Sequence, residues 1–328
     1  MTSLLVFREQ LRKFYSRYEL YITPVSKFLL ALITLLVING SIGYMSELKN
    51  FAVVLVLSLM CSFLPSNFIV ILAALVTLGH LYKFSLECAV VALALFLLLF
   101  ILYFRFSPKD TLVVILTPIC FVFKIPYVIP IAAGLAGTPF SVVSVASGVV
   151  VYYTLHYMNA SASVLNTFEE DGALEKFRYV IDGLMGNKTM FVTIVAFVAT
   201  LLVVYFIRRL SVDYAWTIAV ITGALLNILI LLFGDLMYNI NLPIIGLIFG
   251  NLIAAAVAKA LEFLVFNVDY SRTERVQFED DEYYYYVKAV PKNTVAAPQK
   301  RVKTIRVPEK AVRMSGQTSG RQKRDLEK

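Results

Sequence analysis

The sequence predicts an all-α, multi-pass membrane protein. Of the 328 residues, 59% are hydrophobic and only 16% are charged, and the mean hydropathy is +0.76, unlike an ordinary soluble domain. Several apolar runs reach about 18 residues, the length that crosses about 30 Å of hydrocarbon as a helix. A membrane β-barrel would instead show ten-residue segments of alternating hydrophobicity, and the sequence has none.

Residues 1–27 precede the first apolar run and carry an amphipathic pattern. Large apolar side chains recur at alternating steps of three and four from Leu4 to Tyr21, with Arg8 and Arg12 at other positions. The pattern predicts a cytoplasmic interfacial helix on anionic inner-leaflet lipids. Packing of this helix on the protein's own loops is the alternative.

The transmembrane domain is expected to extend over residues 28–266, with six full-length helices. The corresponding runs are 28–45, 88–104, 139–158, 189–207, 215–233 and 244–266. Each has few or no charged residues, as a membrane helix requires.

Two pairs of shorter, proline-broken apolar arms lie between these runs. Residues 51–64 and 68–81 flank Pro65-Ser66-Asn67, and residues 111–123 and 127–136 flank Lys124-Ile125-Pro126. Arms this short either form a helical hairpin that re-enters the membrane or cross where the bilayer is thin. The sequence therefore predicts six full spans plus two short hairpins, or ten spans if every arm crosses.

The stretch from Thr111 to Met158 is the most interrupted part of the domain. Its prolines are Pro118, Pro126, Pro130 and Pro139. In lipid, backbone groups freed by proline survive only inside protein or beside water. Under the expected topology the two short pairs open to opposite sides of the membrane, a pattern that points to a transporter's substrate site.

The distribution of lysine and arginine predicts the orientation. The N-terminal segment, the 105–109 link, the 208–209 link and the tail are basic, whereas the 159–188 loop is net negative. The basic segments are expected in the cytoplasm. Both termini are then cytoplasmic, and the 159–188 loop, with a short amphipathic helix near its end, is extracytoplasmic.

Polar residues inside apolar runs are the candidate pathway residues. They are Lys124, Ser141, Ser144, Asn227, Asp235, Asn251, Lys259 and Glu262. An ionisable residue within a membrane is costly and therefore points to function. Two alternatives remain open: the serines mark close helix packing, and Lys259 snorkels to the cytoplasmic surface beside Glu262, its partner at i+3.

A ladder of small residues on the last span predicts tight helix packing. Gly246, Gly250, Ala254 and Ala258 are spaced four residues apart. Such a ladder lets a second helix approach closely. The partner helix lies either in the same chain or in a second copy, so a homo-oligomer stays open.

Residues 267–328 are expected to form a cytoplasmic tail. Residues 274–290 predict a small β-hairpin, because apolar and aromatic runs flank an acidic turn. Residues 291–328 are expected to be disordered, and their basic charge attracts anionic inner-leaflet lipids. Nucleic-acid binding by such a tail is a weaker alternative.

The tail also carries a resemblance. The acidic tetrad Glu279-Asp280-Asp281-Glu282, followed by the tyrosine run Tyr283–Tyr286, falls in the stretch Glu274–Lys292. In this stretch the chain resembles uncharacterised integral membrane proteins of clostridial Gram-positive bacteria. The resemblance implies a bacterial plasma membrane and carries over no activity or functional residue.

Motifs for catalysis and metal binding are absent from the sequence. There is no His-Glu-x-x-His, no Walker lysine loop and no Gly-x-Ser-x-Gly. The three cysteines, Cys61, Cys88 and Cys120, lie in apolar runs with no paired spacing. We therefore expect neither a catalytic site nor a metal or cofactor.

Two functions remain. The first is a small-solute or ion transporter, or a permease subunit, which would need a separate ATPase subunit if transport is driven by ATP. The second is a membrane scaffold that recruits a partner protein through its basic, tyrosine-rich tail.

Overall fold

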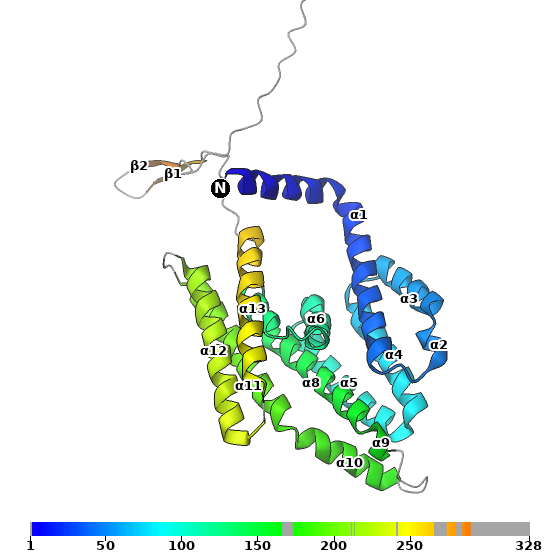
Figure 1. The fold of residues 1–328 in the computed structure, drawn as a ribbon. Helices are drawn as coiled ribbons and strands as arrows, with labels where there is room; N and C mark the ends of the chain where they lie inside the picture. The colour runs from blue at the N-terminus through cyan, green and yellow to red at the C-terminus, as the bar shows by residue number, and fades with distance from the viewer. Residues whose placement is uncertain are drawn as a thin grey trace, which may run out of the picture. The chain divides into compact units, whose positions relative to one another are not determined.

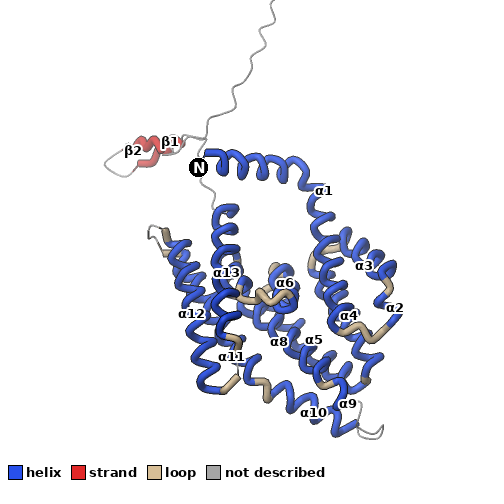
Figure 2. The backbone as a smooth tube through the Cα atoms, viewed as in Figure 1, coloured by secondary structure: helices blue, strands red, loops and turns tan. Residues whose placement is uncertain are grey.

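The computed structural model describes residues 2–165, 173–210, 212, 214–240, 242–265, 274–279 and 284–289. Phe7–Asn267 forms one compact unit, and the two β-strands belong to another. The helices are α1 (Thr2–Ser41), α2 (Ser46–Lys49), α3 (Phe51–Phe63), α4 (Asn67–Phe84), α5 (Leu86–Phe106), α6 (Thr111–Val122), α7 (Val128–Ala136), α8 (Ser141–Ala160), α9 (Ala162–Leu165), α10 (Ala173–Met185), α11 (Lys188–Arg208), α12 (Ala215–Tyr238) and α13 (Ile244–Val265) (Figures 1 and 2).

Seven helices among the described residues are long and apolar enough to cross a membrane: α1 from Lys13 onward, α4, α5, α8, α11, α12 and α13. The chain is therefore a multi-pass, all-α membrane protein by helix length and composition. Helix α4 is the addition to the six predicted spans. It continues through Lys83 to Phe84 and has 18 residues, so the predicted arm 68–81 is too short. His80, which marks the predicted end, is instead buried inside the helix.

Helix α1 bends at Tyr18, shortly before its midpoint. Tyr18 has non-helical φ and ψ of −114° and 17°, and Figure 1 shows the change of direction. Pro24 lies within two turns and has no amide hydrogen to donate, which weakens the helix there. Before the bend, Arg8 donates to the Phe263 carbonyl of α13 at 3.5 Å and lies over the Phe263 ring. The bend therefore falls before Phe28, the predicted start of the first span.

Contacts between helices define two ends of the Phe7–Asn267 unit. We name the first the Asn67 end, where Tyr103 of α5 donates to Oδ1 of Asn67 and the hydroxyls of Ser107 and Ser144 are 2.7 Å apart. The second is the Asn159 end, where the amide of Asn159 donates to the carbonyl of Ser41 at 3.0 Å. Helices α1, α4 and α8 run from the Asn67 end to the Asn159 end, and α5 runs back.

Helices α3 and α4 together cover the full length of the unit. At the Asn67 end, Lys27 of α1 donates to the Leu64 carbonyl at 3.1 Å, beside the turn between the two helices. At the Asn159 end, Asn39 donates to the Leu48 carbonyl, just before α3 begins. The 51–81 pair is therefore not a shallow hairpin, because its turn and its outer ends lie at opposite ends of the unit.

Helices α6 and α7 form a hairpin that returns to the end where it began. Thr111 at the start of α6 lies 3.1 Å from the Tyr103 hydroxyl. After α7, the guanidinium of Arg208 donates to the carbonyls of Leu135 and Gly137, at the same Asn67 end. The hairpin stops short of the Asn159 end, because Phe121 stacks on Tyr152 of α8, eight residues or about 12 Å before that helix ends.

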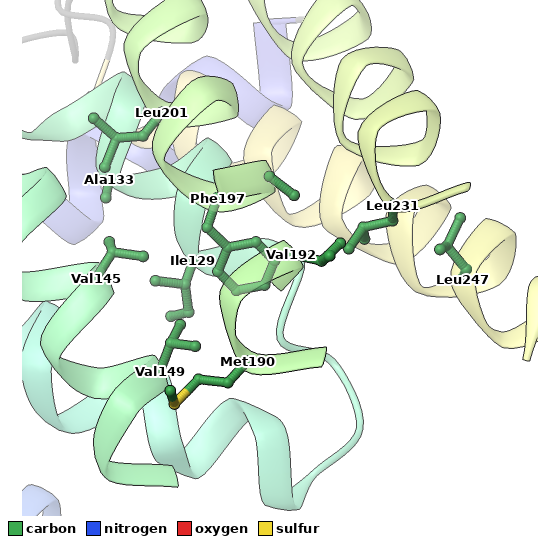
Figure 3. Packing of buried hydrophobic residues seen from close by; sticks show 11 residues of the cluster. Ile129, Ala133, Val145, Val149, Met190, Val192, Phe197, Leu201, Leu231 and Leu247 are labelled. Carbon is green, nitrogen blue, oxygen red and sulfur yellow. The ribbon is translucent and has the colours of Figure 1, made fainter. Parts of the chain in front are cut away.

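Helix α7 is surrounded by protein. Figure 3 shows Ile129 and Ala133 of α7 against Phe197 and Leu201 of α11, with Val145 of α8 beside them. Phe197 and Leu201 have no exposed surface. A nine-residue helix is too short to be stable alone, so this apolar packing holds α7 in place.

The small-residue ladder of α13 faces α7. A Cβ on Gly250 would lie 2.5 Å from the ring of Tyr127, and Ala254 and Ala258 are buried in the cluster that contains Leu135. Only Gly246 is exposed. The partner of the ladder in this structure is therefore the return arm of the hairpin in the same chain.

The second unit contains the strands β1 (Glu274–Glu279) and β2 (Tyr284–Ala289). They pair antiparallel, with Glu274 opposite Ala289 and Glu279 opposite Tyr284. The predicted disordered tail, residues 291–328, lies outside the described residues.

Candidate functional site

A cavity of 440 Å³ lies among α1, α4, α5, α6 and α8. Its volume is within the range of about 300–1,000 Å³ that is usual for ligand pockets. Apolar side chains from these five helices make up most of its wall. They include Val37, Val70, Phe100, Ile115 and Pro118. The α6 side of the hairpin thus forms one wall.

A hydrogen-bond network closes the cavity at the Asn67 end. Tyr103 lines the cavity and is 2% exposed. Its hydroxyl donates to Oδ1 of Asn67 at 3.0 Å and lies 3.1 Å from the hydroxyl of Thr111, which also donates to Asn67. The start of α4, the end of α5 and the start of α6 are therefore joined beneath the cavity.

The Asn159 end of the cavity is more open. Gly40, Lys124, His156 and Asn159 line it there and are exposed. Asn159 donates to the Ser41 carbonyl and accepts from the Tyr44 hydroxyl at 2.8 Å. These bonds hold the last turns of α1 and α8 together at the rim.

The Tyr44 hydroxyl remains a donor over the physiological pH range. Burial, with a smaller contribution from Cys88, raises the pKa of Tyr44 above its ordinary value of about 10. The phenol is therefore protonated near pH 7 and can donate to Asn159.

Lys124 occupies the tip of the hairpin in an unusual conformation. Its φ is +60°, and the amide of Ile125 donates to the Cys120 carbonyl while that of Lys124 donates to the Phe121 carbonyl. This is a Schellman motif, in which the left-handed position is usually glycine. A lysine there costs about 1 kcal/mol relative to glycine.

Of the predicted serines, neither Ser141 nor Ser144 lines the cavity. Ser141 accepts from the Thr138 amide at 3.1 Å, and Ser144 bonds Ser107. Ser147, one turn further along α8, does line it. A Cβ on Gly148 would lie 2.5 Å from Thr117, so this face of α8 also packs closely against α6.

Asn227 and Asn251 pair with each other inside the α12–α13 contact. Nδ2 of Asn227 donates to Oδ1 of Asn251 at 3.0 Å, and Nδ2 of Asn251 donates to the Leu247 carbonyl. The side chains are 0% and 1% exposed. The Oδ1 of Asn227 has no partner among the described residues. Neither asparagine lines the 440 Å³ cavity.

Asp235 stabilises the turn after α12. Its Oδ1 accepts from the backbone amide of Leu242 at 3.0 Å, across the α12–α13 turn. The carboxylate therefore fixes the turn at the Asn159 end.

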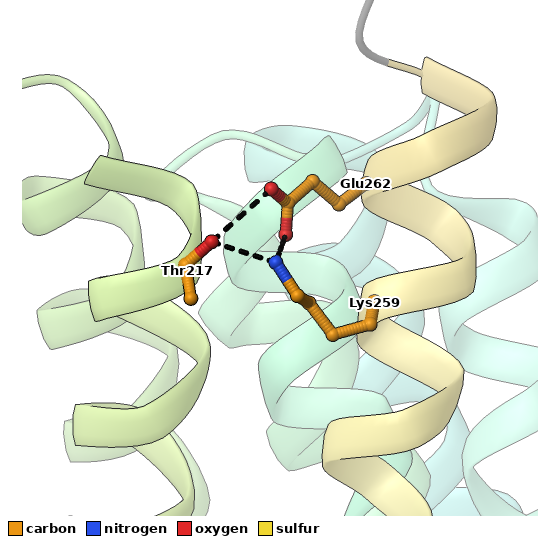
Figure 4. Close-up of polar contacts among 3 residues, drawn as sticks. All are labelled: Thr217, Lys259 and Glu262. Atoms are coloured by element: carbon orange, nitrogen blue, oxygen red, sulfur yellow. Dashed lines mark hydrogen bonds and ion pairs between the residues drawn. The ribbon is translucent and has the colours of Figure 1, made fainter. Parts of the chain in front are cut away.

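Lys259 and Glu262 form an ion pair, and the hydroxyl of Thr217 is hydrogen-bonded to both, as Figure 4 shows. Nζ of Lys259 lies 2.8 Å from Oε2 of Glu262 and 2.6 Å from Oγ1 of Thr217. The lysine and glutamate side chains are 49% and 20% exposed. The ion pair lies near the end of α13 and does not line the cavity.

The structure brings only one of the predicted pathway residues, Lys124, to the cavity. Sequence reasoning missed Thr34, Thr77 and His156, which line it from α1, α4 and α8. These residues are far apart in the sequence, so the sequence does not indicate that they lie around one cavity. The position of His156, a polar residue near the end of an apolar run, is the signal that was present.

No group of three or more potential metal ligands occurs among the described residues. Comparisons with protein-family models, with curated proteins and with solved structures found no match.

Proposed function

We propose that this chain is a transporter, or the permease subunit of one, and that its solute binds in the 440 Å³ cavity. The proposal is carried by one observation: the α6 side of a hairpin that turns back inside the unit forms a wall of that cavity. Irregular backbone within a membrane domain is tolerated where it is enclosed by protein or lines water. In secondary transporters, broken segments of this kind form substrate sites.

The proposed topology has eight crossings, made by α1, α3, α4, α5, α8, α11, α12 and α13, and the hairpin adds none. Helix α3 has 13 residues, about 20 Å, and would cross where the bilayer is thin. Arg105, Lys109, Arg208 and Arg209 lie at the Asn67 end, which we place in the cytoplasm. The Asn159 end is then extracytoplasmic, in what we propose is a bacterial plasma membrane.

The Tyr103 network and the exposed rim support an outward-facing state. In this state the cavity is closed toward the cytoplasm and accessible from the other side. Transport then requires the network at the Asn67 end to open while the Asn159 end closes, which is alternating access. If ATP drives this change, a separate ATPase chain supplies the energy.

Cysteine accessibility in oriented membrane vesicles tests the proposal. Single cysteines are placed at Gly40 and Ser147 after Cys61, Cys88 and Cys120 have been replaced by alanine. A Cβ on Gly40 meets nothing within 4 Å, so this cysteine is tolerated. We expect a membrane-impermeant thiol reagent to label both positions from the extracytoplasmic side.

The matched control is Leu97→Cys, which lies on α5 outside the cavity lining and is 55% exposed. A cysteine facing lipid does not react with an impermeant reagent. Labelling of the cavity positions no faster than Leu97→Cys, from either side, would overturn the proposed pathway.

A scaffold role is the second candidate, and the two-stranded sheet favours it. A sheet of only two strands has two edges, and exposed edges can accept a strand from a partner. Deletion of residues 267–328 separates the candidates. A scaffold loses its partner while the membrane domain stays folded, whereas a transporter keeps the cavity accessible to the reagent.

A further inference from the structure

We infer that the cavity binds an organic anion with an apolar body, whose acidic group lies at Lys124 and His156. The inference rests on the proposed function, since it assigns a substrate class to the same cavity. Three features of the wall support it: its charge, the position of its lysine and its apolar surface.

The charge of the wall is positive. Lys124 lines the cavity, and none of the described residues that line it is an aspartate or a glutamate. The ammonium of Lys124 has no hydrogen-bond or ion-pair partner among the described residues. Lys124 is exposed at the open rim, so its ammonium is accessible to an anion that enters the cavity, and the wall is complementary to a negative group.

Lys124 is also not what the local backbone prefers. The left-handed position of a Schellman motif is normally glycine, and the φ of Lys124 is +60°. Glycine would adopt the backbone conformation of this turn with less strain. We therefore infer that a lysine occupies the position because of what its side chain does. Strain of this kind clusters at ligand sites.

The rest of the wall suits an apolar body. The rings of Phe121 and Tyr152 stack at 4.4 Å, and those of Tyr152 and His156 stack at 5.7 Å. This aromatic column runs from the hairpin to the rim, and all three residues line the cavity. A ligand can place its acid beside Lys124 and the His156 ring, and its apolar part on the aliphatic side chains of α1, α4 and α5.

Two sources share this chemistry: a membrane lipid with an acidic headgroup and an alkyl or aryl acid from the aqueous phase. Both carry one acidic group on an apolar body, and both would meet the same lysine. Competition between a lipid and a water-soluble acid distinguishes them.

Photoaffinity labelling tests the inference. The full-length protein, in phosphatidylcholine nanodiscs, is exposed to a palmitic-acid analogue that carries a mid-chain diazirine and a terminal alkyne, and labelled peptides are mapped. We expect labels on the cavity-lining parts of α1, α4, α5, α6 and α8. Palmitate should compete, and palmityl alcohol, which has the same chain without the charge, should not.

Two variants and a control sharpen the test. Lys124→Asn removes the charge and keeps a residue that tolerates left-handed φ, and it should reduce labelling about tenfold or more. Gly40→Phe should also reduce labelling, because the ring occupies open cavity space. Lys109→Asn changes an exposed lysine outside the cavity and should leave labelling unchanged.

Competition by phosphatidylglycerol would identify a lipid, and competition by octanoate would identify an aqueous acid; both support the anion. Cavity labelling that survives Lys124→Asn and is equally competed by palmityl alcohol overturns anion recognition but leaves the proposed function standing. Absence of cavity labelling also overturns the substrate class. Failure of the proposed function is seen separately, as absence of thiol labelling at Gly40→Cys and Ser147→Cys.

Discussion

The hydroxyl of Tyr103 donates a hydrogen bond to Oδ1 of Asn67, with the two oxygens 3.0 Å apart. This bond joins the end of α5 to the start of α4 directly below the cavity. Thr111, at the start of the hairpin, donates to the same amide oxygen. Oδ1 of Asn67 therefore connects α4, α5 and the hairpin at the closed end of the cavity. In the proposed transport cycle this is the contact that must break.

Tyr103→Phe should loosen that closure. The variant removes one donor without changing the size of the ring, which costs about 1 kcal/mol. We expect Ser147→Cys to become reactive from the cytoplasmic side in this background. Tyr82→Phe is the control, because Tyr82 is on α4 but is 66% exposed. Unchanged cytoplasmic reactivity would show that the network does not close the cavity.

Lys124→Gly should stabilise the fold while removing the proposed anion contact. Glycine adopts the φ of +60° without strain, so the free energy of unfolding should rise by about 1 kcal/mol. Thermal unfolding in detergent measures this change. Asn239→Gly is the matched control, since Asn239 has a φ of +50° at a helix end. Asparagine already tolerates that region, so the free energy of unfolding should rise less than in Lys124→Gly. A loss of stability in Lys124→Gly would mean that the lysine side chain holds the turn.

The small-residue ladder of α13 offers a matched pair of variants. A Cβ at Gly250 would lie 2.5 Å from the Tyr127 ring, whereas at Gly246 the nearest atom is 3.6 Å away. Gly250→Ala should therefore destabilise the protein by about 1–3 kcal/mol, and Gly246→Ala should be nearly neutral. Equal Tm values for the two variants would contradict the packing of α7 on this ladder.

The buried asparagine pair should behave as a unit. Asn251→Leu leaves the amide of Asn227 buried without an acceptor, which costs about 1–3 kcal/mol. Replacing both asparagines with leucine should cost less than this single change, because no unpaired amide remains. A double-mutant cycle in thermal unfolding measures the coupling. Additive effects would show that the pair contributes nothing as a pair.

The class of the fold is readable from the sequence because membrane helices are determined by local composition. The six long runs correspond to α1, α5, α8, α11, α12 and α13. The seventh, α4, was assigned too few residues, because His80 and Lys83 look like the end of a span. In the structure Nε2 of His80 and Oδ1 of Asn39 are 2.7 Å apart, and this partner makes the polar residue tolerable inside the helix.

The site was harder to predict, because a cavity depends on how distant helices meet. The sequence indicates Lys124 through its position between two apolar arms, and the cavity contains it. It also indicates Asn227 and Asn251, which are hydrogen-bonded to each other between two helices. Polarity within a span therefore does not distinguish a residue that faces a cavity from one that pairs with its neighbour.

The α6–α7 hairpin begins and ends at the same end of the unit, which has a consequence for how the protein can diversify. A segment that returns to its starting face contributes no net crossing, so residues 111–136 could be exchanged or resized without inverting α8 or any later helix. The part of the cavity wall that the hairpin contributes can thus be replaced while the orientation of the other helices stays intact. If the chain transports a solute as proposed, a lineage of such proteins can change its substrate there while it retains one topology.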